Sequence, residues 1–127
     1  MIRIYTDASF SHRENRGTWA FIILDHNALT EQAGFGKGDH NRLELEAVVR
    51  GLSQVKVGSR AKIYTDSTYV YQLTQGARAE TNLDLVSDLK SLQKGKEVKF
   101  KLIKRRKKSL AKRVDDLVNN LLRGKHG

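Results

Sequence analysis

Short stretches of alternating or continuous apolar residues predict five β-strands along the chain. Gly17 marks a turn before the second, and the third follows closely enough to complete a meander. The second is an unbroken apolar run, as expected of a buried strand, and in the fifth the apolar residues alternate with lysines. The predicted strands cover residues 2–7, 19–24, 28–35, 61–66 and 97–103.

Apolar residues spaced three and four apart predict helices in the rest of the chain. One of these helices starts at Thr81, where Thr81 and Asp84 have the spacing of a capping box. Glycines at 34, 36 and 38 lack the spacing of a phosphate-binding motif, so they predict a plain loop after the third strand. The predicted helices cover residues 41–55, 69–73, 81–92 and 109–122.

The tetrapeptide Ile-Tyr-Thr-Asp occurs twice, at residues 4–7 and 63–66, and each copy has the composition of a strand. Asp7 and Asp66 are therefore expected at the ends of two strands, where active sites are commonly built. If the strands are neighbours, two anionic groups share a small space. Such a pair is tolerable only if one group is protonated or a cation lies between them, so the repeat raises the possibility of a metal site.

Helical spacing separates the acids of the helices into two kinds. Glu44 precedes apolar residues by three and four positions and is expected at the edge of the buried face near the helix start. Glu46 precedes Arg50 by four, the arrangement of a surface ion pair. In the last helix Asp116 is expected to face solvent, whereas Asp115 lies at the edge of the packed face. The chain thus offers four candidate site carboxylates: Asp7, Glu44, Asp66 and Asp115.

Composition narrows the class of protein. The chain has 127 residues, 39% of them hydrophobic, which predicts a single domain over residues 1–127. It contains no cysteine, so disulfides and thiolate metal sites are excluded, and no apolar run is long enough to span a membrane. We expect a cytoplasmic monomer. The net charge is +10, and residues 94–113 alone hold eleven Lys or Arg against one Glu. This basic stripe predicts a polyanionic partner.

The four carboxylates lie in segments that resemble the acidic motifs of type I ribonuclease H, in the order of that family and on matching elements. The segments are Tyr-Thr-Asp-Ala-Ser at 5–9, Asn-Arg-Leu-Glu-Leu at 41–45, Tyr-Thr-Asp-Ser at 64–67 and Arg-Val-Asp-Asp-Leu at 113–117. The resemblance covers nearly the whole chain. It implies an α/β fold of the RNase H type, with a five-stranded mixed sheet of three antiparallel and then two parallel strands, flanked by helices.

The resemblance also implies hydrolysis of the RNA strand of an RNA/DNA hybrid with two divalent ions, Mg²⁺ or alternatively Mn²⁺. Two ions about 4 Å apart need several hard oxygen ligands, one ion activating water and one stabilising the leaving oxygen. By analogy Asp7 bridges both ions, Glu44 and Asp66 hold the leaving-group side, and Asp115 the water side. Any one of these acids could instead be a surface charge or a helix cap, Asp66 in particular.

Two features depart from the family pattern. Many members carry a histidine in the loop before the last helix, but here the loop reads Lys-Arg-Arg-Lys-Lys at 104–108, and a cation of that kind is a poor proton shuttle at neutral pH. The basic protrusion that some bacterial members insert before the helix at Asn82 is also missing. We hypothesise that the basic stripe, including Lys104 and Arg105, binds the hybrid in its place.

Further substrate contacts are suggested by position. Asn41 matches an amide that the family uses on the minor groove of the hybrid, and it could equally cap its helix. Ser9 and Thr68 follow the two strand acids, where contacts to the RNA 2′-hydroxyl are expected, although a tight turn also favours them. His40 is interpreted as an inert exposed loop residue, and Trp19 as part of the core.

Two other functions stay open from sequence alone. The first is a protein that keeps the fold and binds nucleic acid with little or no catalysis, which the two departures favour. The second is a nuclease of the same superfamily that cleaves DNA junctions or ends. The meander followed by Asn-Arg-Leu-Glu at 41–44 argues against the second.

Overall fold

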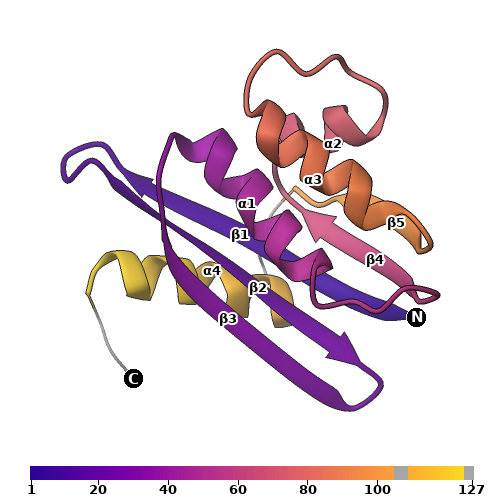
Figure 1. Ribbon diagram of the computed structural model, residues 1–127. Coiled ribbons are helices and arrows are strands. Elements are labelled where there is room, and N and C mark those ends of the chain that lie inside the picture. The colour runs from indigo at the N-terminus through magenta and orange to yellow at the C-terminus, as the bar shows by residue number, and fades with distance from the viewer. Residues whose placement is uncertain (105–108, 125–127) are drawn as a thin grey trace.

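A five-stranded mixed sheet forms the centre of the molecule in the computed structural model, which describes residues 1–104 and 109–124 (Figure 1). The strand order is β3-β2-β1-β4-β5; the first three strands are antiparallel, and β4 and β5 run parallel to β1. This topology confirms the predicted fold. The strands are β1 Ile2–Ser11, β2 Arg16–Asp25, β3 Ala28–Gly36, β4 Arg60–Thr65 and β5 Glu97–Leu102.

Helices cover the two faces of the sheet unequally. Three of them pack on one face, and the last packs on the other, against β1, β2 and β3. Within the described residues, no helix is both long and apolar enough to cross a bilayer. The helices are α1 His40–Leu52, α2 Thr68–Thr74, α3 Leu83–Gln93 and α4 Ser109–Leu122.

Strand β2 is buried on both faces, which explains its unbroken apolar sequence. Trp19 and Phe21 point toward the core under α1–α3, and Ala20 and Ile22 toward the smaller core under α4. Successive side chains of a strand face opposite sides of a sheet, so a strand between two helical layers needs apolar residues at every position. The assignment of Trp19 to the core is confirmed, with 6% of its surface exposed.

Several predicted boundaries were wrong. β1 runs on to Ser11, so Asp7 lies inside the strand and not at its end. Gly34 and Gly36 belong to β3 instead of a loop. The first helix ends at Leu52, three residues before the predicted end.

The predicted capping box at Thr81 is also wrong. Helix α3 begins at Leu83, after Asn82, whose backbone is left-handed (φ 56°) and whose side chain makes no capping hydrogen bond. Asp84 instead binds Arg42 of α1. A tertiary ion pair has therefore taken the side chain that the local pattern assigned to the helix terminus.

Two glycines, paired across β2 and β3, let the start of α1 lie close to the sheet. Gly17 and Gly36 are partners in the β2–β3 register, and both face Leu43, which is fully buried. A Cβ at Gly36 would lie 2.6 Å from Leu43 Cδ2, and one at Gly17 would overlap Leu43 Cδ1 and lie 3.0 Å from the Ser9 carbonyl oxygen. Because Glu44 follows Leu43, this close approach also sets the position of a candidate site residue.

We expect Gly17→Val to lower the free energy of unfolding by about 1–3 kcal/mol, since overpacking a filled core costs that much. It should also displace the first turn of α1 and, with it, Glu44. Urea unfolding gives the first effect, and the affinity for divalent ions gives the second. Thr30→Val, at an exposed position of β3, is the matched control. Equal behaviour of the two variants would show that Leu43 does not depend on the glycine.

Candidate active site

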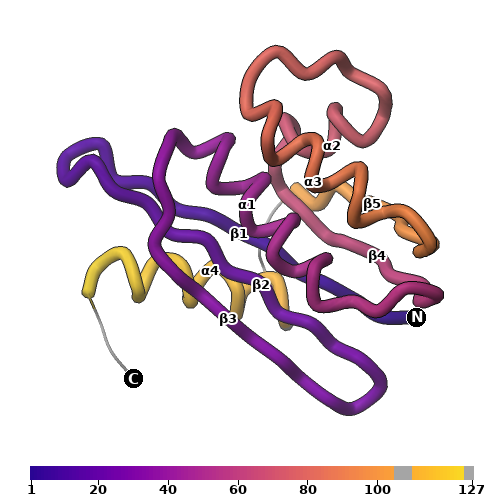
Figure 2. Tube along the Cα trace, viewed as in Figure 1, coloured from indigo at the N-terminus to yellow at the C-terminus, as the bar shows by residue number. Residues whose placement is uncertain are grey.

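The sheet opens where the candidate carboxylates lie. β1 pairs with β4 from Ile2 and Ala61 to Tyr5 and Tyr64, and β4 ends at Thr65. β1 continues beyond this point, paired with β2 alone (Figure 2). Asp7 is two residues past the last β1–β4 pair, and Asp66 directly follows β4. The two acids of the repeated tetrapeptide therefore flank the place where neighbouring strands separate.

Glu44 reaches the same place from the opposite side of the sheet. α1 packs on the face that holds Ile4, whereas Asp7 shares the other face of β1 with Tyr5, which packs toward α4. Where neighbouring strands are paired, the sheet backbone separates side chains on its two faces. The gap beyond the end of β4 removes this barrier, so the side chains of Asp7 and Glu44 can meet. Asp7, Glu44 and Asp66 each offer one carboxylate oxygen, and these three atoms lie within 4.8 Å of one another.

The three carboxylates are mostly shielded from water. Asp7 is 1% exposed and Glu44 is 2% exposed, while Asp66 is half-buried. Like charges this close repel strongly where water cannot screen them, and a cation between them removes the repulsion. The buried Oε1 of Glu44 accepts no hydrogen bond within the described residues. A shielded oxygen in that condition, beside two further carboxylates, suits a hard cation such as Mg²⁺.

Asp115 lies on α4 and is not a member of this three-carboxylate group. Its helix packs against β1, on the face to which Asp7 belongs, and its side chain is half-buried, as predicted. The Nδ2 of Asn119 donates to Asp115 Oδ1 at 3.0 Å, and Ser9 Oγ donates to Asn119 Oδ1 at 3.0 Å. The structure thus brings together three of the four predicted carboxylates and ties the fourth to β1 through an amide.

Sequence reasoning missed Asn119 and placed His40 in a loop. His40 is the first residue of α1, not a loop residue, and its Nε2 lies 3.4 Å from Glu44 Oε2, with 53% of its side chain exposed. Asn119 holds Asp115. Each lies four positions from a predicted carboxylate, so the one-turn helical spacing that sorted the acids could also have identified them.

The structure removes the helix-cap alternatives for two candidates. The cap of α1 is Asp39, whose Oδ1 accepts from the Arg42 backbone N–H at 2.9 Å, and Asn41 is exposed. The cap of α2 is Ser67, whose Oγ accepts from the Val70 N–H, so Asp66 does not cap it.

The other residues predicted to contact the hybrid are in different environments. The Ser9 hydroxyl is used on Asn119. Thr68, the first residue of α2, is exposed, and so is Lys104. Arg105, like the rest of 105–108, lies outside the described residues.

Asp116 is exposed as predicted, whereas Glu46 forms its predicted ion pair but is more buried than a surface residue. Arg50 Nε lies 2.8 Å from Glu46 Oε2, although Glu46 is only 17% exposed, and Lys112 Nζ lies 3.2 Å from Asp116 Oδ2. Arg113, a member of the basic stripe, is bonded across the molecule to Glu31 of β3 at 2.7 Å. The described part of the stripe therefore includes cations already neutralised by acids.

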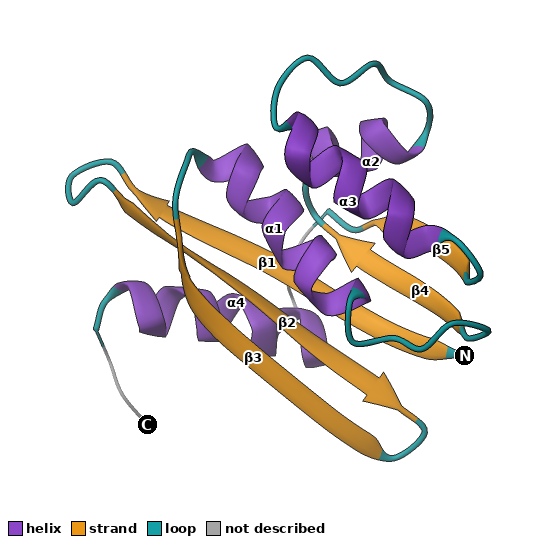
Figure 3. Cartoon of the chain, in the orientation of Figure 1, coloured by secondary structure: helices purple, strands orange, loops and turns teal. Residues whose placement is uncertain are grey.

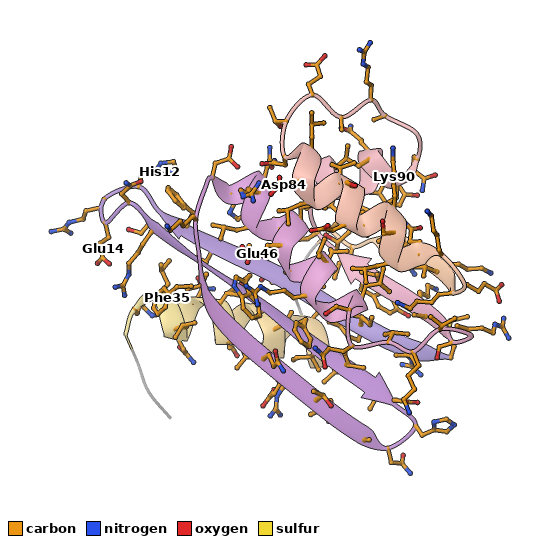
Figure 4. The ribbon with its side chains drawn as sticks, in the orientation of Figure 1. His12, Glu14, Phe35, Glu46, Asp84 and Lys90 are labelled. Carbon is orange, nitrogen blue, oxygen red and sulfur yellow. The ribbon has the colours of Figure 1, made fainter. Side chains whose placement is uncertain are left out.

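A polar network joins α1, α2 and α3, which pack on the same face of the sheet. Arg42 of α1 donates two hydrogen bonds to Asp84 of α3, at 2.9 and 2.7 Å, and Asn82 Nδ2 donates to the Tyr69 hydroxyl of α2. Figure 4 shows Asp84 at the start of α3, beside the first turns of α1. The hydrogen-bonded Arg42 guanidinium lowers the pKa of Asp84 to about 2.

This shift predicts an acid-dependent contribution to stability. A carboxyl group whose pKa is lower in the folded state stabilises the fold at any pH above its usual pKa of 3.8. This contribution is lost as the pH falls from about 4 toward 2. Asp84→Asn should therefore show a flatter dependence of the urea midpoint on pH between 4 and 2. Asp88→Asn, on an exposed position of the same helix, is the control. Parallel pH profiles for all three proteins would contradict the assignment.

Comparison with known proteins gives consistent matches. A family model described as RNase H matches residues 1–122. Ribonuclease H of Thermoanaerobacter sp. (strain X514) is 37% identical over 71 residues, which are 55% of this chain and 46% of that protein. Ribonuclease H of Caldicellulosiruptor saccharolyticus is 28% identical over 117 residues, covering 80% and 81% of the two chains. The matched region is about half the length of the first of these relatives.

Solved structures agree with the topology. LC11-RNase H1 in complex with an RNA/DNA hybrid superimposes with a TM-score of 0.77 at 23% identity, covering 94% of this chain and 95% of that one. The N-terminal RNase H domain of a Mycobacterium tuberculosis protein, fused to maltose-binding protein, gives 0.78 at 19% identity, covering 97% and 94%. At sequence identities this low, the structural similarity supports the fold alone.

Proposed function

Because this chain belongs to the ribonuclease H family, we propose that it is an endonuclease that hydrolyses the RNA strand of RNA/DNA hybrids with divalent metal ions. The observation that carries the proposal is the meeting of Asp7, Glu44 and Asp66 at the opening of the sheet. These residues come from a strand, a helix and a strand end, and nothing in the packing of an apolar core requires three acids there.

The residues present fit a metal site. All three ligands are carboxylates, the class that Mg²⁺ and Mn²⁺ prefer, and the unsatisfied Oε1 of Glu44 supports this use. Bound divalent ions supply an activated water and stabilise charge on the leaving oxygen. Two such ions would be held by Asp7, Glu44, Asp66 and Asp115.

The chain's own contribution is to fix these groups before substrate arrives. The Ala8 backbone N–H donates to Asp7 Oδ1 at 2.9 Å, which orients that carboxylate. Asn119 holds Asp115 in the same way and is itself held by Ser9. We assign Ser9 primarily to this support and retain Asn41, Thr68, Lys104 and Arg105 as proposed contacts to the hybrid.

The test is cleavage of a hybrid whose RNA strand carries a 5′ label, in Mg²⁺, in Mn²⁺ and with chelator. We expect internal cuts in the RNA strand only, in the presence of metal, and no cuts in duplex DNA of the same sequence. Tight binding of the hybrid without cleavage in either metal would instead establish a nucleic-acid-binding protein, which the absence of histidine from residues 104–108 favours. Cleavage of duplex DNA would establish a different nuclease.

A further inference from the structure

One half of the sheet is covered on a single face. α4 packs against β1, β2 and β3, whereas β4 and β5 are covered by α2 and α3 on their other face (Figure 3). The apolar residues of β5 face that covered side, and its alternate positions, Lys99 and Lys101, are exposed. The face of β4 and β5 turned away from α2 and α3 therefore meets solvent.

The residues on this face form two rows across three strands. Register places Arg3 of β1 beside Lys62 of β4, and Lys62 beside Lys99 of β5. The next row along the strands is Tyr5, Tyr64 and Lys101. Neighbouring strands are about 4.8 Å apart, so each row places its side chains within roughly 10 Å. We call Arg3, Lys62, Lys99 and Lys101, with the two tyrosines, the basic sheet face.

The positive charge of this face is not neutralised within the described residues. Its one acid, Glu97, is paired with Arg60 at 2.9 Å. No ion pair among residues 1–104 and 109–124 involves the four cations of the face. Like charges directly opposite each other destabilise a sheet. Lysines on an edge strand such as β5 can serve to prevent aggregation, but Arg3 and Lys62 lie on inner strands, where that purpose does not apply.

The two tyrosines favour contact with phosphates over contact with bases. Their rings stack on each other, with centroids 4.5 Å apart and planes 7° apart, and Lys62 Nζ lies 5.4 Å from the centre of the Tyr64 ring. The stacked ring faces are used within the protein, and Tyr5 also packs against the core under α4, so the half-buried rings are poor platforms for stacking a base. Cations and hydroxyls together bind the backbone of a nucleic acid, a contact without sequence preference.

We propose that the basic sheet face is a second nucleic-acid site, which binds the phosphates of a single-stranded segment. Tyr5 and Tyr64 are each two residues before a carboxylate of the candidate active site, a distance of about 7 Å along a strand. The face is thus continuous with that site. A single strand is flexible enough to follow the sheet from the opening, whereas bending a duplex, whose persistence length is about 50 nm, costs energy. Binding here does not require cleavage, so the inference goes beyond the proposed function.

The test measures binding of labelled single-stranded DNA, a 20-residue thymidine oligonucleotide, in chelator. The variant is Lys62→Gln/Lys99→Gln, and the matched control is Lys56→Gln/Lys90→Gln, which removes the same charge at exposed positions elsewhere. We expect the face variant to bind about tenfold more weakly, and its log–log salt slope to fall by about 1.4, or 0.7 for each lost phosphate contact. The control should change less than twofold.

Three results would overturn the inference: equal effects of the two double variants, no effect of either, or weakened binding of blunt duplex alone. Thermal unfolding of both variants shows whether the fold is kept, and Lys62→Arg/Lys99→Arg should restore affinity because it restores the charge. Since the readout uses neither metal nor cleavage, its failure leaves the proposed hydrolysis intact. Failure of the hybrid cleavage assay likewise leaves this site standing.

Discussion

Asp7→Asn is expected to lower the rate of hybrid cleavage by at least about 10³-fold, the loss that follows when a charged group central to transition-state stabilisation is removed. The same substitution should raise the stability of the metal-free protein by about 1 kcal/mol or more. Asp7 is 1% exposed and lies beside two other carboxylates, so a neutral isostere relieves repulsion. Single-turnover cleavage and urea unfolding in chelator give the two numbers.

The opposite signs of these two effects separate a metal site from a structural cluster. Saturating Mg²⁺ should stabilise the parent protein by mass action and leave Asp7→Asn nearly unchanged. Asp88→Asn, exposed on α3, should match the parent in all three measurements. If Asp7→Asn were less stable than the parent in chelator, the carboxylates would be held by protein contacts, and the case for a cation at the sheet opening would be lost.

Asp115→Asn is expected to reduce cleavage by about 10²-fold or more, whereas Asp116→Asn changes it less than twofold. The two residues are adjacent on α4 and carry the same charge, but Asp115 is turned toward β1 and Asp116 toward Lys112. The pair is therefore its own control for net charge and helix propensity. Rates at saturating hybrid, measured over a range of Mg²⁺ concentration, show whether the loss lies in metal affinity or in the catalytic step.

Equal rates for the two α4 variants would remove Asp115 from the site and leave three carboxylates. Asn119→Ala adds a second check, because Asn119 contacts Asp115 but is not itself an acid. We expect a loss smaller than that of Asp115→Asn, partly recovered at high Mg²⁺. An unchanged rate for Asn119→Ala would show that Asp115 is oriented without it.

The fold was predictable because its strands and helices differ strongly in period. The bounds of α4, 109–122, match the prediction because its apolar stripe is regular and unbroken. The unbroken apolar run of β2 correctly indicated burial. Local patterns failed where tertiary contacts decide the outcome. Asp84 has the spacing of a capping residue, but a neighbouring guanidinium binds it more favourably than a backbone N–H does.

The candidate site was only partly predictable for a related reason. The repeated tetrapeptide indicated that Asp7 and Asp66 would be neighbours, but it also suggested that both end their strands. β1 is longer because β2 pairs with it well beyond the end of β4. That difference in length creates the opening through which Glu44 reaches the other acids, and no feature of a single strand encodes it. The proximity of His40 to Glu44 depends on where α1 begins, which sequence patterns fix only to within a few residues.

The position of α4 in the sequence affects how the protein folds during synthesis. Among the described residues it follows every other helix and strand in sequence, and it covers the apolar surface formed by Ala20 and Ile22, residues about a hundred positions earlier in the chain. During synthesis this apolar surface is therefore exposed, and the candidate carboxylate Asp115 is missing, until α4 has been made. Chains truncated before α4 should therefore expose this apolar surface, self-associate and lack Asp115.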